Sequence, residues 1–114
     1  MQINNLSKAT SLGTGIALAD NFFTRLVGLL TRKRLLEGEG LLLTKTRAVH
    51  TWGMRFTIDC LFLDRQNQVV QTLPGLAPWR FSPVVRGACQ VLELPSGTIT
   101  RTATLAGDTL VIKK

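Results

Sequence analysis

One stretch near the middle of the chain gathers the residue types that most often bind or react in proteins. Between positions 49 and 64 it holds the only histidine, His50, together with Trp52, Arg55, Asp59 and Cys60. On a β-strand alternate side chains share a face, so such a stretch would display its polar groups in two rows. We therefore expect the candidate site to be centred here, and the rest of the fold must position it.

A metal site is one chemistry that this central stretch could support. His50, Met54 and Cys60 are ligand types that Cu(I) accepts. On a straight strand, however, His50 and Met54 would lie about 13 Å apart, and only a bend at Gly53 would let them share an ion. Two isolated cysteines also lack the paired spacing of a structural zinc site. We predict no metal and no cofactor. In the alternative to a metal site, Trp52, Met54 and Phe56 are core residues and His50 caps them.

Catalysis is a second chemistry that the central stretch could support. Cys60 with His50 and either Asp59 or Glu93 has the composition of a cysteine–histidine–acid set. Adjacent strand residues point to opposite faces, so Asp59 and Cys60 would share a pocket only across a bulge. The ordinary alternatives are an inert, buried Cys60 and a structural ion pair of Arg55 with Asp59 or Glu93. Whether the protein is an enzyme stays open at this point.

Anion capture is the chemistry that the residue types favour most. Arg55 and Arg80, with Arg25 or Arg47, could converge beside the central stretch, where their guanidinium groups would bind a carboxylate or phosphate with two hydrogen bonds. A neighbouring indole could stack on a ring or on a guanidinium group. The candidate ligand-binding residues are His50, Trp52, Arg55, Asp59, Trp79, Arg80 and Glu93.

The charge balance also favours an anionic partner. The chain has 14 lysines and arginines against 7 carboxylates, a net charge of +7, which attracts nucleic acids, phospholipid surfaces or acidic proteins. The cations are scattered apart from Arg32-Lys33-Arg34, and the aromatic residues lie mostly in apolar segments. A nucleic-acid surface usually shows a denser basic stripe with stacking aromatics. We expect a small anionic ligand or a protein partner, and we find no specific nucleic-acid motif.

The length and the apolar content are those of one domain with its own core. Of the 114 residues, 45% are apolar, and a domain of this size removes roughly two thirds of its unfolded surface from water. We expect a single domain over residues 1–114. No apolar run is long enough to form a membrane span. The segment from Ala9 to Ile16 is too polar for the apolar region of a signal peptide, so we expect a cytoplasmic protein.

Short strands separated by turns dominate the predicted secondary structure. Helical spacing of apolar residues predicts one helix over 22–33. The prolines of 74–83 predict an irregular loop, and 98–106 is ambiguous between extended chain and a helical turn. The expected strands are one or two irregular ones within 2–19, then 41–43, 49–56, 60–63, 69–73, 90–94 and 110–112, with a hairpin turn at 65–68. We predict an α+β fold, mainly antiparallel: a small twisted β-barrel or sheet with one or two short helices.

Several short motifs occur in an order and spacing that resemble a known family. They are RLVGLL (25–30), GEGLLL (38–43), HTWGMRF (50–56), ID (58–59), FLD (62–64), PWR (78–80), LELP (92–95) followed by Gly97, and GD (107–108). In these motifs the chain resembles the DUF192 domains, also called UPF0127. The resemblance implies a compact β-rich domain with short helices, including a helical turn near 98–104. It implies no catalytic residue.

One functional hypothesis leads. We predict a DUF192-like, non-catalytic binding or accessory module that recognises a small anion or an anionic segment of a partner. Two alternatives stay open: a hydrolase-type enzyme that uses His50 with a carboxylate, and a basic protein-interaction domain that uses Arg32 to Arg34.

Overall fold

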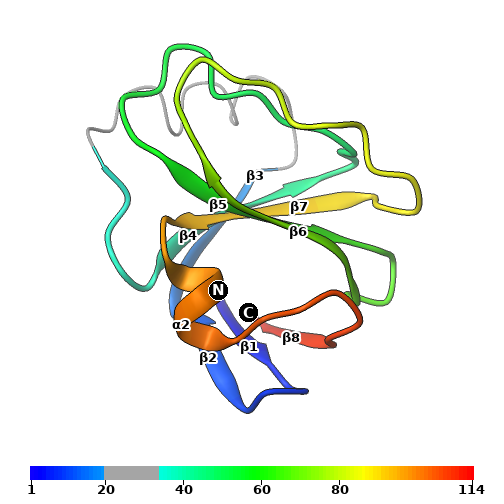
Figure 1. Ribbon diagram of the computed structural model, residues 1–114. Helices are drawn as coiled ribbons and strands as arrows, with labels where there is room; N and C mark the ends of the chain where they lie inside the picture. Colours follow the sequence, from blue (N-terminus) through cyan, green and yellow to red (C-terminus); the bar gives the residue numbers. More distant parts are fainter. Residues whose placement is uncertain (20–33) are drawn as a thin grey trace.

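The computed structural model describes residues 1–19 and 34–114, which form short strands and one short helix (Figure 1). The strands are β1 (Gln2–Asn5), β2 (Thr10–Gly13), β3 (Gly15–Ala19), β4 (Glu39–Thr44), β5 (Ile58–Leu63), β6 (Val69–Leu76), β7 (Gln90–Pro95) and β8 (Leu110–Lys113). The helix, α2 (Thr98–Thr102), lies between β7 and β8. The helix predicted over 22–33 lies outside the described residues.

The described strands form two open sheets. Three strands are arranged in the order β2-β1-β8, and five in the order β3-β4-β7-β5-β6. Neighbouring strands are antiparallel except for β3 and β4, which are parallel. Mainly antiparallel β-structure with a short helix is therefore confirmed. Of the two predicted forms, the described strands adopt sheets and not a closed barrel.

The two faces of the larger sheet pack into separate cores. One core lies between the two sheets and includes Ile3 of β1, Leu94 of β7 and Ile99 of α2, each at most 7% exposed. The other lies on the opposite face, where Phe62 of β5 packs with Met54, outside the sheet. Since successive strand residues point to opposite faces, the apolar residues of the larger sheet are divided between the two cores.

Two long loops cover the second core, and we call them together the two-loop end. They are residues 45–57, between β4 and β5, and residues 77–89, between β6 and β7 (Figure 1). The loops run antiparallel: Ser82 N–H donates to the Val49 carbonyl over 2.8 Å, and His50 and Phe81 form an isolated β-bridge.

The strand predicted over 49–56 is wrong, because a turn interrupts the alternating pattern. Met54 N–H donates to the Thr51 carbonyl over 3.1 Å, and Gly53 has φ 81°. A type II turn requires such a positive φ at its third residue. The turn breaks the run of alternate side chains that the sequence pattern suggests. As a result Met54 is buried, while Trp52, two residues before it, is 50% exposed.

The hairpin predicted at 65–68 is confirmed. It links β5 to β6, and the Asp64 carboxylate accepts the backbone N–H groups of Gln66 and Gln68, both over 2.9 Å. Asn67 takes the left-handed conformation, with φ 61°. Asparagine and aspartate favour such turns because their short polar side chains hydrogen-bond to nearby backbone groups.

The helix α2 depends on a carboxylate that is distant in the sequence. Its N-cap is Gly97, which supplies no side chain, and the Asp59 carboxylate of β5 takes that place. One oxygen, Oδ2, accepts the Gly97 and Ile99 N–H groups over 3.1 and 2.9 Å, and Oδ1 accepts the Gly75 N–H over 2.9 Å. A negative charge at a helix N-terminus satisfies unpaired donors there. The family resemblance therefore predicted this helical turn correctly.

A second buried carboxylate, Asp108, ties the end of the chain to its beginning. Its oxygens accept hydrogen bonds from the Asn5 amide, the Lys8 ammonium and the Leu105 N–H at 2.8–3.0 Å. Burial by itself would raise the pKa of Asp108, but these hydrogen bonds and the Lys8 charge lower it below the ordinary value of 3.8. The contacts of Asp108 are thus strongest when its carboxyl group is ionised.

Asp108 is expected to make the stability of the protein sensitive to acid. A carboxyl group with a lowered pKa in the folded state stabilises that state above its unfolded-state pKa, and this contribution is lost as the pH falls through the folded-state pKa. The free energy of unfolding should therefore fall below about pH 4. In Asp108→Asn this fall should be shallower, as denaturant titrations at several pH values would measure. Equal slopes in the two proteins would show that Asp108 is not responsible.

Candidate functional site

Thr51 joins the two loops of the two-loop end. Its side chain is fully buried; the hydroxyl donates to the Ala77 carbonyl over 2.6 Å and accepts the Arg80 N–H over 3.0 Å. Its backbone N–H donates to the Arg80 carbonyl, and its carbonyl accepts the Trp79 N–H. With a longer contact of 3.4 Å from the hydroxyl to the Arg80 carbonyl, five hydrogen bonds fix the segment 77–80 against this one residue.

The Thr51 hydrogen bonds hold Trp79 in an unusual backbone conformation. Trp79 has φ 64°, in the left-handed region, which costs a non-glycine residue roughly 1–2 kcal/mol. Its ring is nonetheless 62% exposed, so core packing does not account for the strained geometry. A strained residue held by its surroundings is a frequent feature of functional sites.

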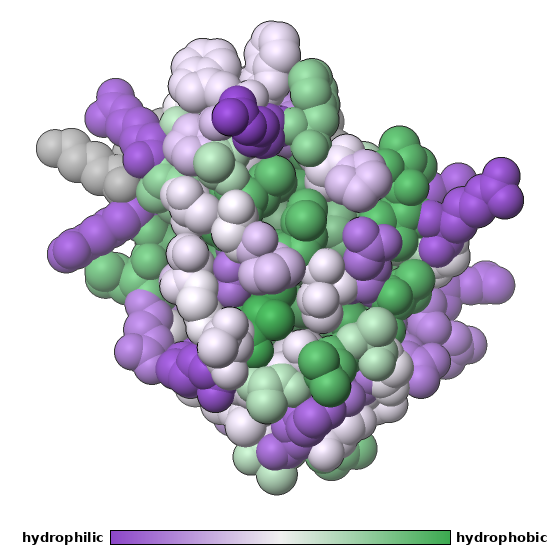
Figure 2. Space-filling model, in the orientation of Figure 1, coloured by the Kyte–Doolittle hydropathy of each residue, from purple (hydrophilic) through white to green (hydrophobic). Residues whose placement is uncertain are grey.

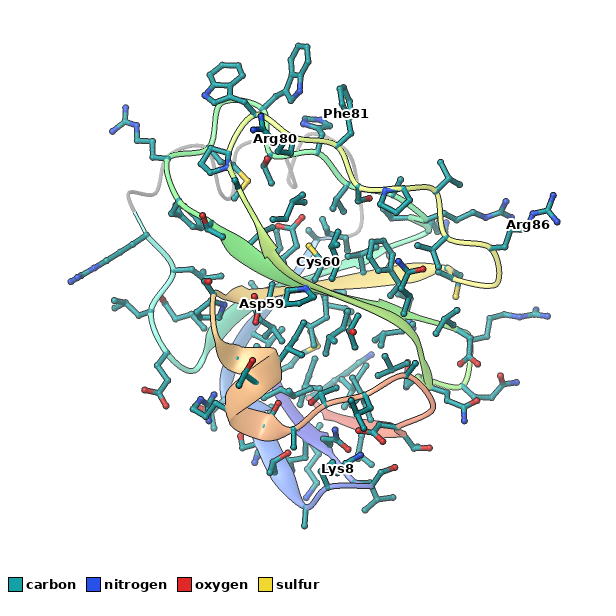
Figure 3. All side chains as sticks on the ribbon, in the orientation of Figure 1. Lys8, Asp59, Cys60, Arg80, Phe81 and Arg86 are labelled. Atoms are coloured by element: carbon teal, nitrogen blue, oxygen red, sulfur yellow. The ribbon has the colours of Figure 1, made fainter. Side chains whose placement is uncertain are left out.

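Three aromatic rings lie together on the surface of the two-loop end. The Trp52 ring centroid lies 6.1 Å from that of Trp79 and 5.2 Å from that of Phe81. The three side chains are 50–68% exposed. Figure 3 shows Phe81 and Arg80 at this end of the molecule, well away from Asp59 in the sheet. We call Trp52, Trp79 and Phe81 the aromatic cluster.

His50 lies beside the aromatic cluster. It contacts Phe81 edge-on, with ring centroids 6.2 Å apart, and its Nδ1 accepts the Trp52 N–H over 3.4 Å. The imidazole is exposed. His50 therefore adds a polar, hydrogen-bonding ring to one edge of the cluster.

The two-loop end is strongly cationic. Its loops contain no aspartate or glutamate, and their cations are all exposed: Lys45, Arg47, Arg55, Arg80 and Arg86. Figure 2 shows apolar and near-neutral side chains standing out at this end, with strongly hydrophilic ones beside them. Exposed cations without neutralising carboxylates on the same loops favour the approach of an anion, although Arg86 lies apart from Arg80 and Phe81 (Figure 3).

The two predicted carboxylates are buried in the sheet, unlike the exposed aromatic cluster. Asp59 stands opposite Leu94 on the pair β5–β7, and Glu93 stands opposite Cys60, so the two carboxylates are on different faces of the sheet. Asp59 is 1% exposed and Glu93 is 4% exposed. Asp59 does not form the ion pair expected with Arg55, because its oxygens accept three backbone N–H groups instead.

The cysteines do not form a reactive site with His50. Both are free, with Cys60 buried and Cys89 half-buried. Burial, followed by the negative charges of Glu93 and Asp59, raises the pKa of the Cys60 thiol far above its usual range. The nucleophilic form of cysteine is the thiolate, so Cys60 is an inert core residue. Among the described residues, no group of three His, Cys, Asp or Glu side chains could hold a metal ion.

The structure thus separates the seven predicted site residues into two groups. His50, Trp52, Trp79 and Arg80 come together at the two-loop end, and Arg55 lies exposed on the same loop as Trp52. Asp59 and Glu93 are buried in the sheet. The interpretation of Trp52 as a core residue is wrong. Of the basic segment 32–34 in the alternative hypothesis, only Arg34 lies within the described residues.

Two important residues of the site were missed from the sequence. Phe81 completes the aromatic cluster and Thr51 holds the two loops together. Phe81 follows Trp79 and Arg80 directly in a proline-rich segment, which was a usable signal. The role of Thr51 had no local signal, because its partners lie 26 and 29 residues away along the chain.

Solved structures share this fold. A protein of unknown function from Novosphingobium aromaticivorans superposes with a TM-score of 0.81 at 18% identity, over 97% of this chain and 82% of that one. A Sinorhizobium meliloti protein superposes with a TM-score of 0.82 at 22% identity, over 96% and 89%. At these identities the likeness concerns the fold alone. In the described part of this chain, no helix is long and apolar enough to cross a membrane.

Sequence relatives place the chain in a family. Residues 4–112 match the family model DUF192, described as "Uncharacterized ACR". A UPF0127 protein of Pyrococcus furiosus is 36% identical over 109 residues, 93% of each chain. A UPF0127 protein of Pyrococcus horikoshii is 33% identical over 98 residues, 83% of this chain and 84% of its own. With the motifs, the fold and these relatives in agreement, the chain belongs to the DUF192 (UPF0127) family.

Proposed function

We propose that this protein is a non-catalytic binding module and that the two-loop end recognises a small anion or an anionic segment of a partner. The observation that carries this proposal is the exposed aromatic cluster of Trp52, Trp79 and Phe81, which lies in cationic loops without a carboxylate. Tryptophan and arginine are the residue types that most often dominate binding energy at interfaces.

The chemistry of the surface suits an anion that also carries an apolar part. The Arg80 guanidinium would bind a carboxylate or phosphate with two hydrogen bonds, and the neighbouring rings would cover apolar groups of the same ligand. The Thr51 hydrogen bonds support this role because they hold the Trp79–Arg80 segment in place before a ligand arrives. Such preorganisation lowers the entropy cost of binding.

The arrangement supports binding better than hydrolysis. A hydrolase would need His50 and a carboxylate within hydrogen-bonding distance of the same substrate atoms. His50 is exposed at the two-loop end, where its Nδ1 accepts a backbone N–H. Asp59 is committed to three backbone donors on the opposite face of the sheet from Glu93.

Trp79→Gly tests the proposal because it separates binding from stability. Glycine adopts φ 64° without strain, and this relief of strain should offset the lost contact with Trp52. The melting temperature should therefore change little. Affinity should nevertheless fall about thirtyfold if Trp79 is a hot spot. Titrations with pyrophosphate, a nucleoside triphosphate and a polyglutamate peptide, followed by calorimetry, would measure this.

The matched control for charge is Arg65→Gln, which removes an exposed arginine from the hairpin 64–68, outside both loops. It should bind the same probes as the wild-type protein does, while Arg80→Gln should bind them more weakly. A probe that binds tightly and equally to Trp79→Gly, Arg80→Gln and wild type would place its site elsewhere and contradict the proposal.

A further inference from the structure

The aromatic cluster has the composition and exposure of a membrane-docking surface. Trp52, Trp79 and Phe81 are 50%, 62% and 68% exposed, and Val84 on the second loop is 70% exposed. Aliphatic Val84 offers nothing to a stacking base or to a phosphate, but it gains from entering an apolar layer. Tryptophan in particular favours the boundary between headgroups and acyl chains, because its ring is apolar and its N–H is polar.

The charges of the two-loop end complement an anionic lipid surface. Each exposed cation near a bilayer that contains anionic lipids adds to the attraction. Arg80 lies between Trp79 and Phe81 in the sequence, Arg55 is exposed on the loop of Trp52, and neither loop contains a carboxylate. Apolar and near-neutral side chains protrude at this end of the molecule (Figure 2). A bilayer is a broad partner that can contact several protruding side chains at once. Its anionic headgroup layer lies above the apolar layer of acyl chains.

The backbone of the two-loop end presents the rings outward and keeps them there. Trp52 occupies the second position of the turn Thr51–Met54, and Trp79 is held at φ 64° by its hydrogen bond to Thr51. An exposed hydrophobic ring on a strained backbone is disfavoured in an isolated protein. The presence of such a ring here points to a partner that covers it.

From this combination we infer that the two-loop end docks on anionic phospholipid bilayers, with Trp52, Trp79 and Phe81 entering the interface and the arginines binding lipid phosphates. The inference rests on the proposed function, since it uses the same surface and names the source of the anion. Docking of this kind is peripheral and reversible, and its strength grows with buried apolar area and with the anionic lipid content.

Intrinsic fluorescence gives a direct test, because Trp52 and Trp79 are the only two tryptophans in the chain. The protein would be mixed with phosphatidylcholine vesicles in which about a third of the lipid is phosphatidylglycerol. We expect the protein to co-sediment with these vesicles. The tryptophan emission should shift to the blue, and acrylamide should quench it less. Pure phosphatidylcholine vesicles should bind much less protein, and high salt should weaken binding.

Variants keep the test specific to the two-loop end. Replacing Arg55 and Arg80 together by glutamine should lower partitioning about twentyfold or more, since each cation contributes about fivefold. Arg65→Gln, outside the two loops, should leave partitioning within about twofold of wild type. Trp79→Gly should weaken binding while the protein stays folded by circular dichroism. Equal partitioning of all these variants would overturn the inference.

Soluble anionic probes distinguish two cases: the two-loop end binds anions but not bilayers, or it binds no anion at all. Glycerol phosphate, a polyglutamate peptide and a single-stranded oligonucleotide would be titrated under the same conditions. If one of them quenches the tryptophans while vesicles neither sediment the protein nor shift its emission, the bilayer is the wrong partner and the proposed function stands. If neither vesicles nor any soluble probe changes the tryptophan emission, both the bilayer inference and the proposed function are wrong.

Discussion

Replacing Asp59 by asparagine is expected to lower the free energy of unfolding by about 3 kcal/mol, which would lower the melting temperature by roughly 10 °C. The Asp59 carboxylate is 1% exposed and accepts the N–H groups of Gly75, Gly97 and Ile99. An asparagine side chain has one acceptor oxygen. Its amide group would face at least one of these donors and leave it without an acceptor, which is costly in a buried site.

The position of Asp59 gives this prediction a second part. Because it lies in the sheet and bonds to β6 and to the start of α2, Asp59→Asn should leave the affinity of the two-loop end unchanged at a temperature where the variant is folded. Denaturant titration and a binding titration on the same sample would measure both. Glu37→Gln is the control: its side chain is 77% exposed and its ion pair with Arg101 of α2 is long, at 3.6 Å, so the loss of this surface pair should change both quantities little. A loss of affinity in folded Asp59→Asn would return Asp59 to the binding site.

Replacing Thr51 by valine is expected to lower both stability and affinity. Valine has nearly the same shape but cannot donate to the Ala77 carbonyl or accept the Arg80 N–H. The loss should be about 2 kcal/mol of unfolding free energy. Once segment 77–80 is released, Trp79 should relax from its left-handed conformation, and affinity for a polyglutamate probe should fall about tenfold because the site is no longer preorganised.

Thr51→Ser is the matched control, since serine keeps the hydroxyl and loses one methyl group. It should lose only about 0.8 kcal/mol and should bind as wild type does. Chemical denaturation and calorimetric titration of the two variants would show the difference. If Thr51→Val and Thr51→Ser bound the probe equally, the hydroxyl would have no part in positioning the Trp79–Arg80 segment.

Much of the sheet could be predicted from local patterns. The strands at 90–94 and 110–112 and the hairpin at 65–68 were expected and are present in β7, β8 and the β5–β6 turn. In these segments short apolar runs and turn-forming residues agree with the tertiary structure. The local preference of each segment and its environment in the folded protein favour the same conformation, so the pattern of residue types is enough to predict the element.

The segment 49–56 shows where such a pattern fails. His50, Trp52, Met54 and Phe56 alternate as in a strand, yet a single glycine at positive φ turns the chain between Trp52 and Met54. Periodicity records residue types and not dihedral angles, so the turn was invisible to it.

Long-range hydrogen bonds account for the other gaps. Helix α2 is rich in threonine, which favours strands when considered locally, but Asp59, about 40 residues earlier, accepts the Ile99 N–H at its start. The sequence pointed to Asp59 as a candidate because a carboxylate beside His50 and Cys60 could serve a site or pair with Arg55. The same observation fits its role in joining β6 and α2, and only the three-dimensional partners separate these two interpretations.

Part of the expected convergence of candidate residues is seen in the structure. Arginines and tryptophans were expected to converge, and Trp52, Trp79 and Arg80 do meet at the two-loop end. What composition could not give was their exposure, because apolar rings in apolar segments are usually buried. The 50% exposure of Trp52 decides between its two interpretations, as a surface residue of the site and as a core residue.

The central claim is that the two-loop end is the recognition surface, and the most direct measurement is tryptophan emission during titration with anionic probes. Pyrophosphate, polyglutamate and anionic vesicles would each be titrated into wild type, the Arg55→Gln/Arg80→Gln double variant and Arg65→Gln. The account predicts a saturable change in emission with at least one probe, weakened by salt, lost in the double variant and retained in Arg65→Gln. A probe that binds tightly by calorimetry without altering the emission of either tryptophan would contradict it.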